Sequence, residues 1–91
     1  MDPELRKRAT SIGFNTHVPL AHRDVHVQTE VFGRSALRVV TTVTSGGELL
    51  GSREEELPGE VTSLELITEA VQAQHDAMVG TARQGGFDGA H

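Results

Sequence analysis

Apolar and polar side chains alternate along three segments in the first half of the chain, and this alternation predicts β-strands. The segments are residues 12–18, 25–31 and 36–44. Because successive side chains of a strand point to opposite faces of a sheet, each segment would present one largely apolar face. Residues 36–44 give the strongest signal, since β-branched side chains are abundant there.

A fourth strand is expected directly after the third. Ser45-Gly46-Gly47 predicts a hairpin turn, because glycine readily adopts the positive φ angles of tight turns. Residues 48–56 then form a strand that becomes highly charged, which is typical of an edge strand protected against aggregation. Pro58-Gly59 ends this strand.

The second and third strands can be set in register by requiring that one face of the pair be apolar. The register that we predict places Glu30 opposite Arg38, which is a favourable cross-strand pair. The pairs expected on the apolar face are Val31–Leu37, Thr29–Val39, Val27–Thr41 and Val25–Val43. The opposite face would then carry His26, Gln28 and Glu30 beside Arg38, Val40 and Thr42.

The last third of the chain has the periodicity of an amphipathic α-helix. Thr62 is the expected N-cap, with Glu65 at the capping-box spacing, and Gly85-Gly86 is the expected stop. The stripe that should cover the apolar sheet face consists of Leu64, Ile67, Val71, Met78 and Ala82, with His75 among them. A second strip of mainly small side chains, which would permit close approach by another helix, consists of Leu66, Ala70, Ala73 and Ala77.

Together these elements predict an α+β fold, a four-stranded antiparallel meander with one C-terminal helix packed on one face (ββββα). We expect residues 1–11 to form a flexible N-terminal arm, residues 12–84 a single domain and residues 85–91 a flexible tail. The chain has 91 residues, of which 36% are hydrophobic, and it lacks Trp and Tyr. Such a core is thin, so association with another molecule would add stability.

Composition narrows the classes of function. The absence of cysteine excludes disulfides and thiolate metal sites and favours a cytoplasmic location. The net charge of −5 opposes generic binding to the phosphates of nucleic acids. No apolar run approaches the length of a membrane-spanning helix. We therefore expect no nucleic-acid partner, no membrane partner and no cofactor.

The candidate chemistry lies in the histidines, which are His17, His22, His26, His75 and His91. His22 and His26 are four residues apart, but in a strand that spacing separates side chains by roughly 13 Å, too far to share one metal ion. His17 and His26 could lie on the same face of neighbouring strands, although no third ligand is evident. His75 falls on the apolar stripe, where a packed imidazole with one hydrogen bond is the ordinary explanation. We predict no metal site.

The row formed by His26, Gln28 and Glu30 could be catalytic, metal-binding, part of a contact surface or simply solvated. A general base at His26 or Glu30 would also need a nucleophile, oxyanion donors and a pocket, and the sequence pattern supplies none of these. A solvated face usually carries long charged side chains, whereas this face offers Val40 and short threonines beside His and Gln, a mixture typical of an interface.

We therefore expect a non-enzymatic interaction or regulatory module that associates with itself. The candidate contact residues are His26, Gln28, Glu30, Arg38 and Val40 on the sheet and Ala70, Ala73 and Ala77 on the helix. The alternative is a histidine-dependent site for a metal or small ligand that involves His26 or His75.

Several short motifs together resemble a small bacterial domain of deltaproteobacterial type. They are "FNT" at 14–16, "HVQTE" at 26–30, "GG" at 46–47, "QH" at 74–75 with Met78, and "GGFD" at 85–88. The resemblance spans residues 14–88 and implies no activity and no catalytic residue. Val31 stands where an Asp usually follows the Glu of the "HVQTE" motif. The resemblance draws attention to His26, Gln28, Glu30, Gln74 and His75.

Overall fold

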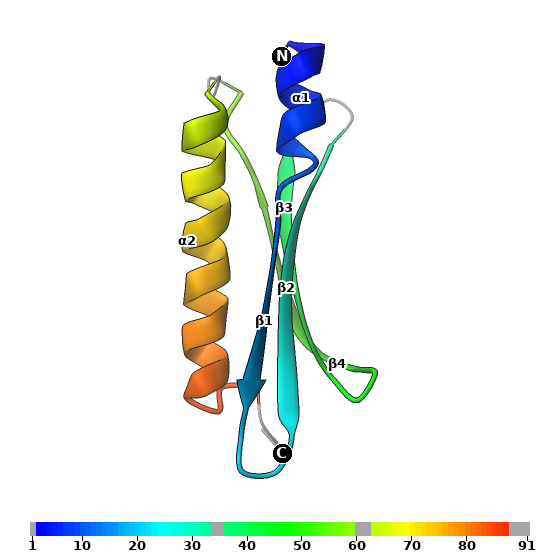
Figure 1. Cartoon of the computed structure of the whole chain (residues 1–91), viewed down its shortest axis with the longest axis vertical. Coiled ribbons are helices and arrows are strands. Elements are labelled where there is room, and N and C mark those ends of the chain that lie inside the picture. The colour runs from blue at the N-terminus through cyan, green and yellow to red at the C-terminus, as the bar shows by residue number, and fades with distance from the viewer. Residues whose placement is uncertain (1, 34–35, 60–62, 88–91) are drawn as a thin grey trace.

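The computed structural model describes residues 2–33, 36–59 and 63–87 and contains one antiparallel sheet and two helices. The strands, in the order β1-β2-β3-β4 across the sheet, are β1 (Gly13–Pro19), β2 (Asp24–Phe32), β3 (Arg38–Ser45) and β4 (Glu48–Glu56). Helix α2 (Leu64–Arg83) lies along one face of the sheet, and a short helix α1 (Pro3–Ala9) lies at one end of the molecule (Figure 1). The predicted ββββα fold is confirmed, with α1 as an addition.

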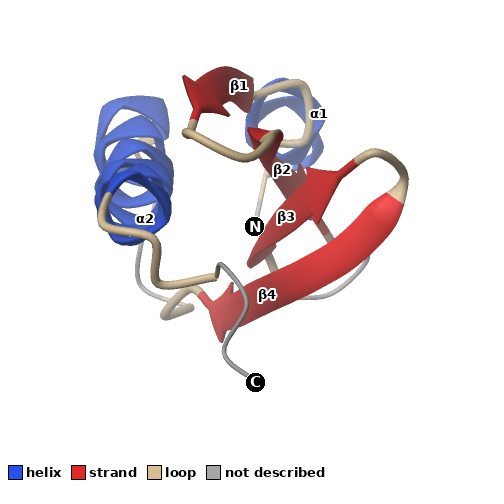
Figure 2. Ribbon diagram, turned by 90° about the horizontal axis from the view of Figure 1, so that it is seen from below, coloured by secondary structure: helices blue, strands red, loops and turns tan. Residues whose placement is uncertain are grey.

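Alternation along the strands determines which face of the sheet is buried. Odd-numbered residues of β2 and β3 are buried, apart from Ser45 at the end of β3, and even-numbered residues are partly or fully exposed. Helix α2 packs mainly over β1, β2 and β3, as the end-on view in Figure 2 shows. The predicted stripe of α2 faces the sheet, because Ile67, Val71, Met78 and Ala82 are all buried.

The predicted register of β2 and β3 is wrong by two residues. Val31 pairs with Val39 rather than Leu37, and Thr29 pairs with Thr41 rather than Val39. A shift of two residues restores the same pleat, so every side chain keeps its predicted face. The observed register matches valine with valine and sets the two buried threonines opposite each other, where their hydroxyls hydrogen-bond at 2.7 Å.

One predicted ion pair is lost with that register. Glu30 lies opposite Val40, and Arg38 lies opposite Phe32. The Arg38 guanidinium instead binds the carboxylate of Glu54 on β4 at 3.1 Å. The cross-strand ion pair therefore joins β3 to the edge strand β4. The Glu30 carboxylate instead accepts a hydrogen bond from Gln28 on its own strand.

Helix α2 begins one residue later than predicted. Ser63 is the N-cap, and its hydroxyl accepts a hydrogen bond from the backbone N–H of Leu66 at 3.4 Å. The expected N-cap, Thr62, lies outside the described residues. The helix passes through Gly80 and ends at Arg83, and Gly85 adopts a positive φ of 75°, as a glycine stop requires.

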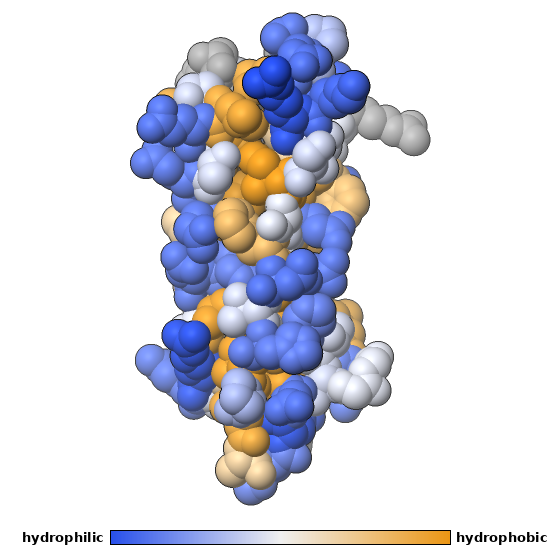
Figure 3. Space-filling model, in the orientation of Figure 1, coloured by the Kyte–Doolittle hydropathy of each residue, from blue (hydrophilic) through white to orange (hydrophobic). Residues whose placement is uncertain are grey.

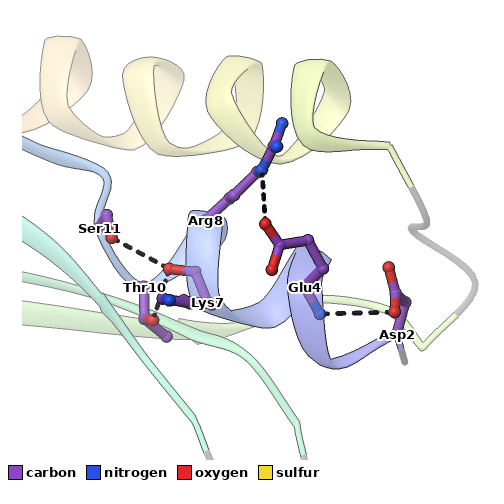
Figure 4. A network of polar contacts seen from close by, with 6 residues as sticks. All are labelled: Asp2, Glu4, Lys7, Arg8, Thr10 and Ser11. Atoms are coloured by element: carbon purple, nitrogen blue, oxygen red, sulfur yellow. Dashed lines mark hydrogen bonds and ion pairs between the residues drawn. The ribbon is translucent and has the colours of Figure 1, made fainter.

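The expected N-terminal arm contains helix α1. The Asp2 carboxylate caps this helix by accepting a hydrogen bond from the backbone N–H of Glu4. The carboxylate of Glu4 binds Arg8 at 3.3 Å. At the other end, the hydroxyls of Thr10 and Ser11 donate to backbone carbonyls of the last turn (Figure 4). Ala9 is fully buried, and Leu5 packs against the same apolar cluster. The sequence signal for this helix is the Asp2-Pro3 pair, an N-cap followed by proline at the first helical position.

The C-terminal segment contributes to the core as far as the structure describes it. Phe87 packs against the apolar cluster near Gly51, and its carbonyl accepts a hydrogen bond from Arg23 at 3.1 Å. Residues 88–91 of the expected tail lie outside the described residues.

Candidate functional site

The sheet face turned away from α2, here called the open face, holds the row of side chains that the sequence analysis singled out. His26, Gln28 and Glu30 share this face with Arg38, Val40 and Thr42, as predicted. Strand pairing arranges the open face in rows, which are Phe32–Arg38–Glu56, Gly13–Glu30–Val40–Glu54, Asn15–Gln28–Thr42–Ser52 and His17–His26–Thr44–Leu49.

A shallow hollow of about 160 Å³ lies on the open face. It is lined by Gln28, Glu30, Phe32, Val40 and Thr42. The Gln28 amide donates a hydrogen bond to the Glu30 carboxylate at its rim. The hollow therefore combines an aromatic ring and a valine with a hydrogen-bonded polar pair.

Large apolar side chains are also exposed on the open face. Phe32 is 44% exposed and Leu49 is 62% exposed, at opposite ends of the face. Phe32 adjoins the hollow, whereas Leu49 stands alone at the far end, and single exposed apolar side chains are normal on protein surfaces.

His17 and His26 lie directly opposite each other on β1 and β2. Their ring centroids are 4.8 Å apart and the rings are tilted by 54°. The His26 Nε2 lies 3.1 Å from Oδ1 of Asn15. Because an amide oxygen only accepts hydrogen bonds, this contact favours the tautomer in which Nε2 carries the proton and Nδ1 the lone pair. The expectation that these two histidines share a face is confirmed.

The remaining histidines do not extend this pair. His22 is exposed in the loop between β1 and β2, and His75 is buried on the other side of the sheet. Across the described residues there is no cluster of three or more His, Cys, Asp or Glu side chains that could hold a metal ion. The structure thus brings together His17 and His26 but not His26 and His75.

His75 belongs to a layer of buried polar side chains inside the molecule. Its Nε2 is 2.8 Å from the Thr16 hydroxyl, and its Nδ1 is 2.8 Å from the Thr29 hydroxyl. The Thr29 hydroxyl is in turn 2.7 Å from that of Thr41. His75 therefore joins α2 to β1 and β2, and the Thr29 hydroxyl extends the connection to β3.

Gln74 extends the layer to the fourth strand. Its amide group donates to the Thr41 hydroxyl at 3.0 Å and to the backbone carbonyls of Val39 and Arg53 at 3.2 Å each. The Gln74 Oε1 is buried, and no hydrogen-bond partner is present for it. Every strand of the sheet is thus held to α2 by at least one hydrogen bond of this layer.

The polar layer lies between two apolar clusters of the core. One cluster contains Val27, Val43 and Met78, and the other contains Val39, Ile67 and Val71. Figure 3 shows an upper and a lower patch of apolar side chains on one side of the molecule, with hydrophilic side chains between them. The core is therefore divided along its length.

Burial controls the protonation of His75. Removal of the imidazole from water lowers its pKa below the ordinary value, and the nearby Asp76 carboxylate opposes this shift only in part. The neutral ring provides one donor and one acceptor, which match one hydroxyl on each side. The geometry suits a structural histidine, in line with the ordinary explanation given for it above.

The second strip of α2 is on the surface. Leu66 is 55% exposed, Ala73 and Ala77 are exposed, and Ala70 is half-buried. This strip remains a second candidate surface for a partner helix.

Sequence reasoning missed Asn15 and the three threonines of the polar layer. Thr16, Thr29 and Thr41 occupy inward positions among valines, where their shape is similar to that of valine and their hydroxyls need partners. The signal that was available is the polar pair Gln74-His75 on the helix stripe, which requires hydrogen-bonding groups on the facing sheet.

Comparisons with protein families, with curated proteins and with solved structures found no match. The resemblance to a small bacterial domain therefore stays a prediction. No helix among the described residues is both long enough and apolar enough to cross a membrane.

Proposed function

We propose that the protein is a small, non-enzymatic interaction module that associates with a second copy of itself through the open face. The observation that carries this proposal is the hollow beside the exposed ring of Phe32, on the sheet face that α2 leaves uncovered. A two-layer domain with one helix layer buries one face of its sheet, so the other face is available to a partner.

The distribution of charge supports a second copy as the partner. Glu30 and the Arg38–Glu54 ion pair lie towards one end of the open face, and His17 and His26, with Asp24 beyond them, lie at the other. The row between them, Asn15–Gln28–Thr42–Ser52, is uncharged. A twofold axis that runs along this row, in the plane between two stacked sheets, would set Glu30 of one copy over His26 of the other.

The size of the core supports association as well. The described core consists mainly of valines, and its largest fully buried side chain is Ile67. A domain of this size buries a small share of its surface, so covering Phe32 and Val40 against a second copy adds apolar burial that the monomer lacks. As a cytoplasmic module, the protein would act through such contacts.

Sedimentation velocity and light scattering at tens of micromolar protein test this proposal. We expect the wild type to form a dimer and the double variant Gln28→Arg/Val40→Glu to be monomeric, because the variant places two charges in the centre of the contact. Ala73→Arg is the matched control, since it adds a charge to the exposed strip of α2 and should remain dimeric. A strictly monomeric wild type, or a dimer that is lost only in Ala73→Arg, would contradict the proposal.

The orientation of the two copies can be tested separately. Glu30→Lys should weaken the dimer, because it sets a lysine over the imidazole of His26 in the other copy. Adding His26→Glu should restore the dimer by re-forming a pair of opposite charges. Failure of the second substitution to restore association would reject this orientation.

A further inference from the structure

The His17–His26 pair is the one described cluster of metal-binding side chains whose rings face each other at the surface. The two residues are direct cross-strand partners with ring centroids 4.8 Å apart. His17 is exposed and His26 is half-buried, so solvent reaches both rings. Both lie at one end of the open face, and neither belongs to the two apolar clusters of the core.

The geometry of the pair suits two ligands of one ion. Metal–nitrogen bonds of imidazole are about 2.0–2.1 Å long, so two nitrogens must approach within about 4 Å of each other to share an ion. Ring centroids 4.8 Å apart are compatible with this separation once a nitrogen of each ring is turned towards the other ring. Sheet pairing holds the two backbones at the distance required.

Asn15 gives His26 the surroundings of a metal ligand. A histidine that binds a metal through one nitrogen usually donates the N–H of the other to a carbonyl or carboxylate oxygen, which orients the ring. Nε2 of His26 lies 3.1 Å from Oδ1 of Asn15 and can donate to it in this way. In that tautomer the lone pair on Nδ1 is available to an ion, and the contact with Asn15 orients the ring.

The donor set selects the class of metal. Imidazole nitrogens favour copper, nickel and zinc, whereas calcium and magnesium require sets of oxygen ligands. Two protein ligands are too few for a closed zinc site, and among divalent ions of this class Cu²⁺ binds a given nitrogen site most strongly. Asp24 on the same strand face and the net charge of −5 also favour a cation.

We propose that His17 and His26 form a surface site for a divalent transition-metal ion, with Cu²⁺ preferred to Ni²⁺ and Zn²⁺ and water completing the coordination. Asn15 is a positioning residue for His26 and makes no bond to the ion. The site goes beyond the proposed self-association, because both imidazoles belong to one chain.

Titration of the untagged protein with Cu²⁺, followed by calorimetry and by electron paramagnetic resonance, tests this site. We expect saturation at one ion per chain, or at one ion per two chains if two pairs share it, with a spectrum that shows nitrogen ligands. His17→Gln and His26→Gln should each weaken binding by more than about tenfold, and Asn15→Ala by about tenfold. Either stoichiometry supports the site when these losses accompany it.

His22→Gln is the matched control, because it removes an exposed histidine of the adjoining loop and should leave copper binding unchanged. Each variant should fold, because the substituted side chains are exposed or half-buried, and circular dichroism is the check. Wild-type copper affinity in both His17→Gln and His26→Gln, or loss of binding in His22→Gln, would overturn the proposal.

Discussion

At the scale of single residues, His75 links the protonation state of the core to its stability. The unfolded chain exposes this imidazole to water, where its ordinary pKa is 6.5, whereas burial lowers the pKa in the folded protein. As the pH falls through 6.5, the unfolded state therefore binds more protons than the folded state. The contribution of His75 to stability is complete above about pH 6.5 and is lost as the pH falls towards the lowered pKa.

We predict that the free energy of unfolding decreases between pH 6.5 and pH 5 and that His75→Gln reduces this dependence. Glutamine keeps a hydrogen bond to one of the two threonine hydroxyls, so the variant should lose about 1–3 kcal/mol at pH 7.5. Urea denaturation at a series of pH values measures both effects. His22→Gln serves as the control, and an undiminished slope in His75→Gln would show that another group is responsible.

A second prediction at this scale concerns zinc. We expect no stoichiometric zinc site of sub-micromolar affinity, because the described residues bring together only two imidazoles and no third His, Cys, Asp or Glu. Calorimetric titration of zinc into the purified protein provides the measurement. A tight site that disappears in His26→Ala would contradict this prediction and favour a histidine-dependent metal protein instead.

At the scale of elements, the sequence predicts best where the pattern is long and purely apolar. The stripe of α2 was predicted correctly because Ile67, Val71 and Met78 recur at the helical period over many turns. The predicted register of β2 and β3 was wrong because it was chosen to pair apolar side chains, and this choice ignores the hydroxyls of Thr29 and Thr41. Their hydroxyls contact the Gln74–His75 layer, and this interaction is visible only once the helix is placed on the sheet.

The candidate site was also predicted only as far as the pattern along a single strand allows. The alternation of β2 was sufficient to place His26, Gln28 and Glu30 on one face and to leave that face without the helix. The pairing of His17 with His26 depends on the β1–β2 register, and the hollow beside Phe32 depends on side-chain packing. Neither is determined by periodicity along one strand. Helix α1 was missed because only two apolar residues, Leu5 and Ala9, mark its buried side, and one pair at the i, i+4 spacing is too short a pattern to indicate a helix.

We predict that docking of α2 depends on Ile67. This side chain is fully buried, so Ile67→Ala should leave a cavity and lower the free energy of unfolding by roughly 2–4 kcal/mol. Leu66→Ala is a matched control on the same helix turn, because Leu66 is 55% exposed and its truncation should change stability by less than about 0.5 kcal/mol. Chemical denaturation compares the two variants. Equal effects would mean that the helix does not dock through its stripe.

At the scale of the whole molecule, a polar layer divides the core, and no helix of the described chain covers the open face of the sheet. The polar layer of Gln74 and His75 aligns the helix with the sheet, but it replaces apolar contacts in the middle of a small core. Exposed Phe32 and Leu49 lie on the face that the helix leaves free. Both features lead to the same expectation, which is that a second copy supplies stability that the monomer lacks.

The last prediction is that the melting temperature of the wild type rises with protein concentration. For a dimer that unfolds to separate chains, a tenfold increase in concentration should raise the melting temperature by about 3–5 °C, whereas a monomer shows no change. Calorimetric melts from a few micromolar to a few hundred micromolar measure this dependence. Gln28→Arg/Val40→Glu should abolish it while leaving the buried core intact, because both substituted side chains lie on the open face. Ala73→Arg should retain it. A wild-type melting temperature that is independent of concentration across this range would show that the open face does not stabilise the fold through a second copy.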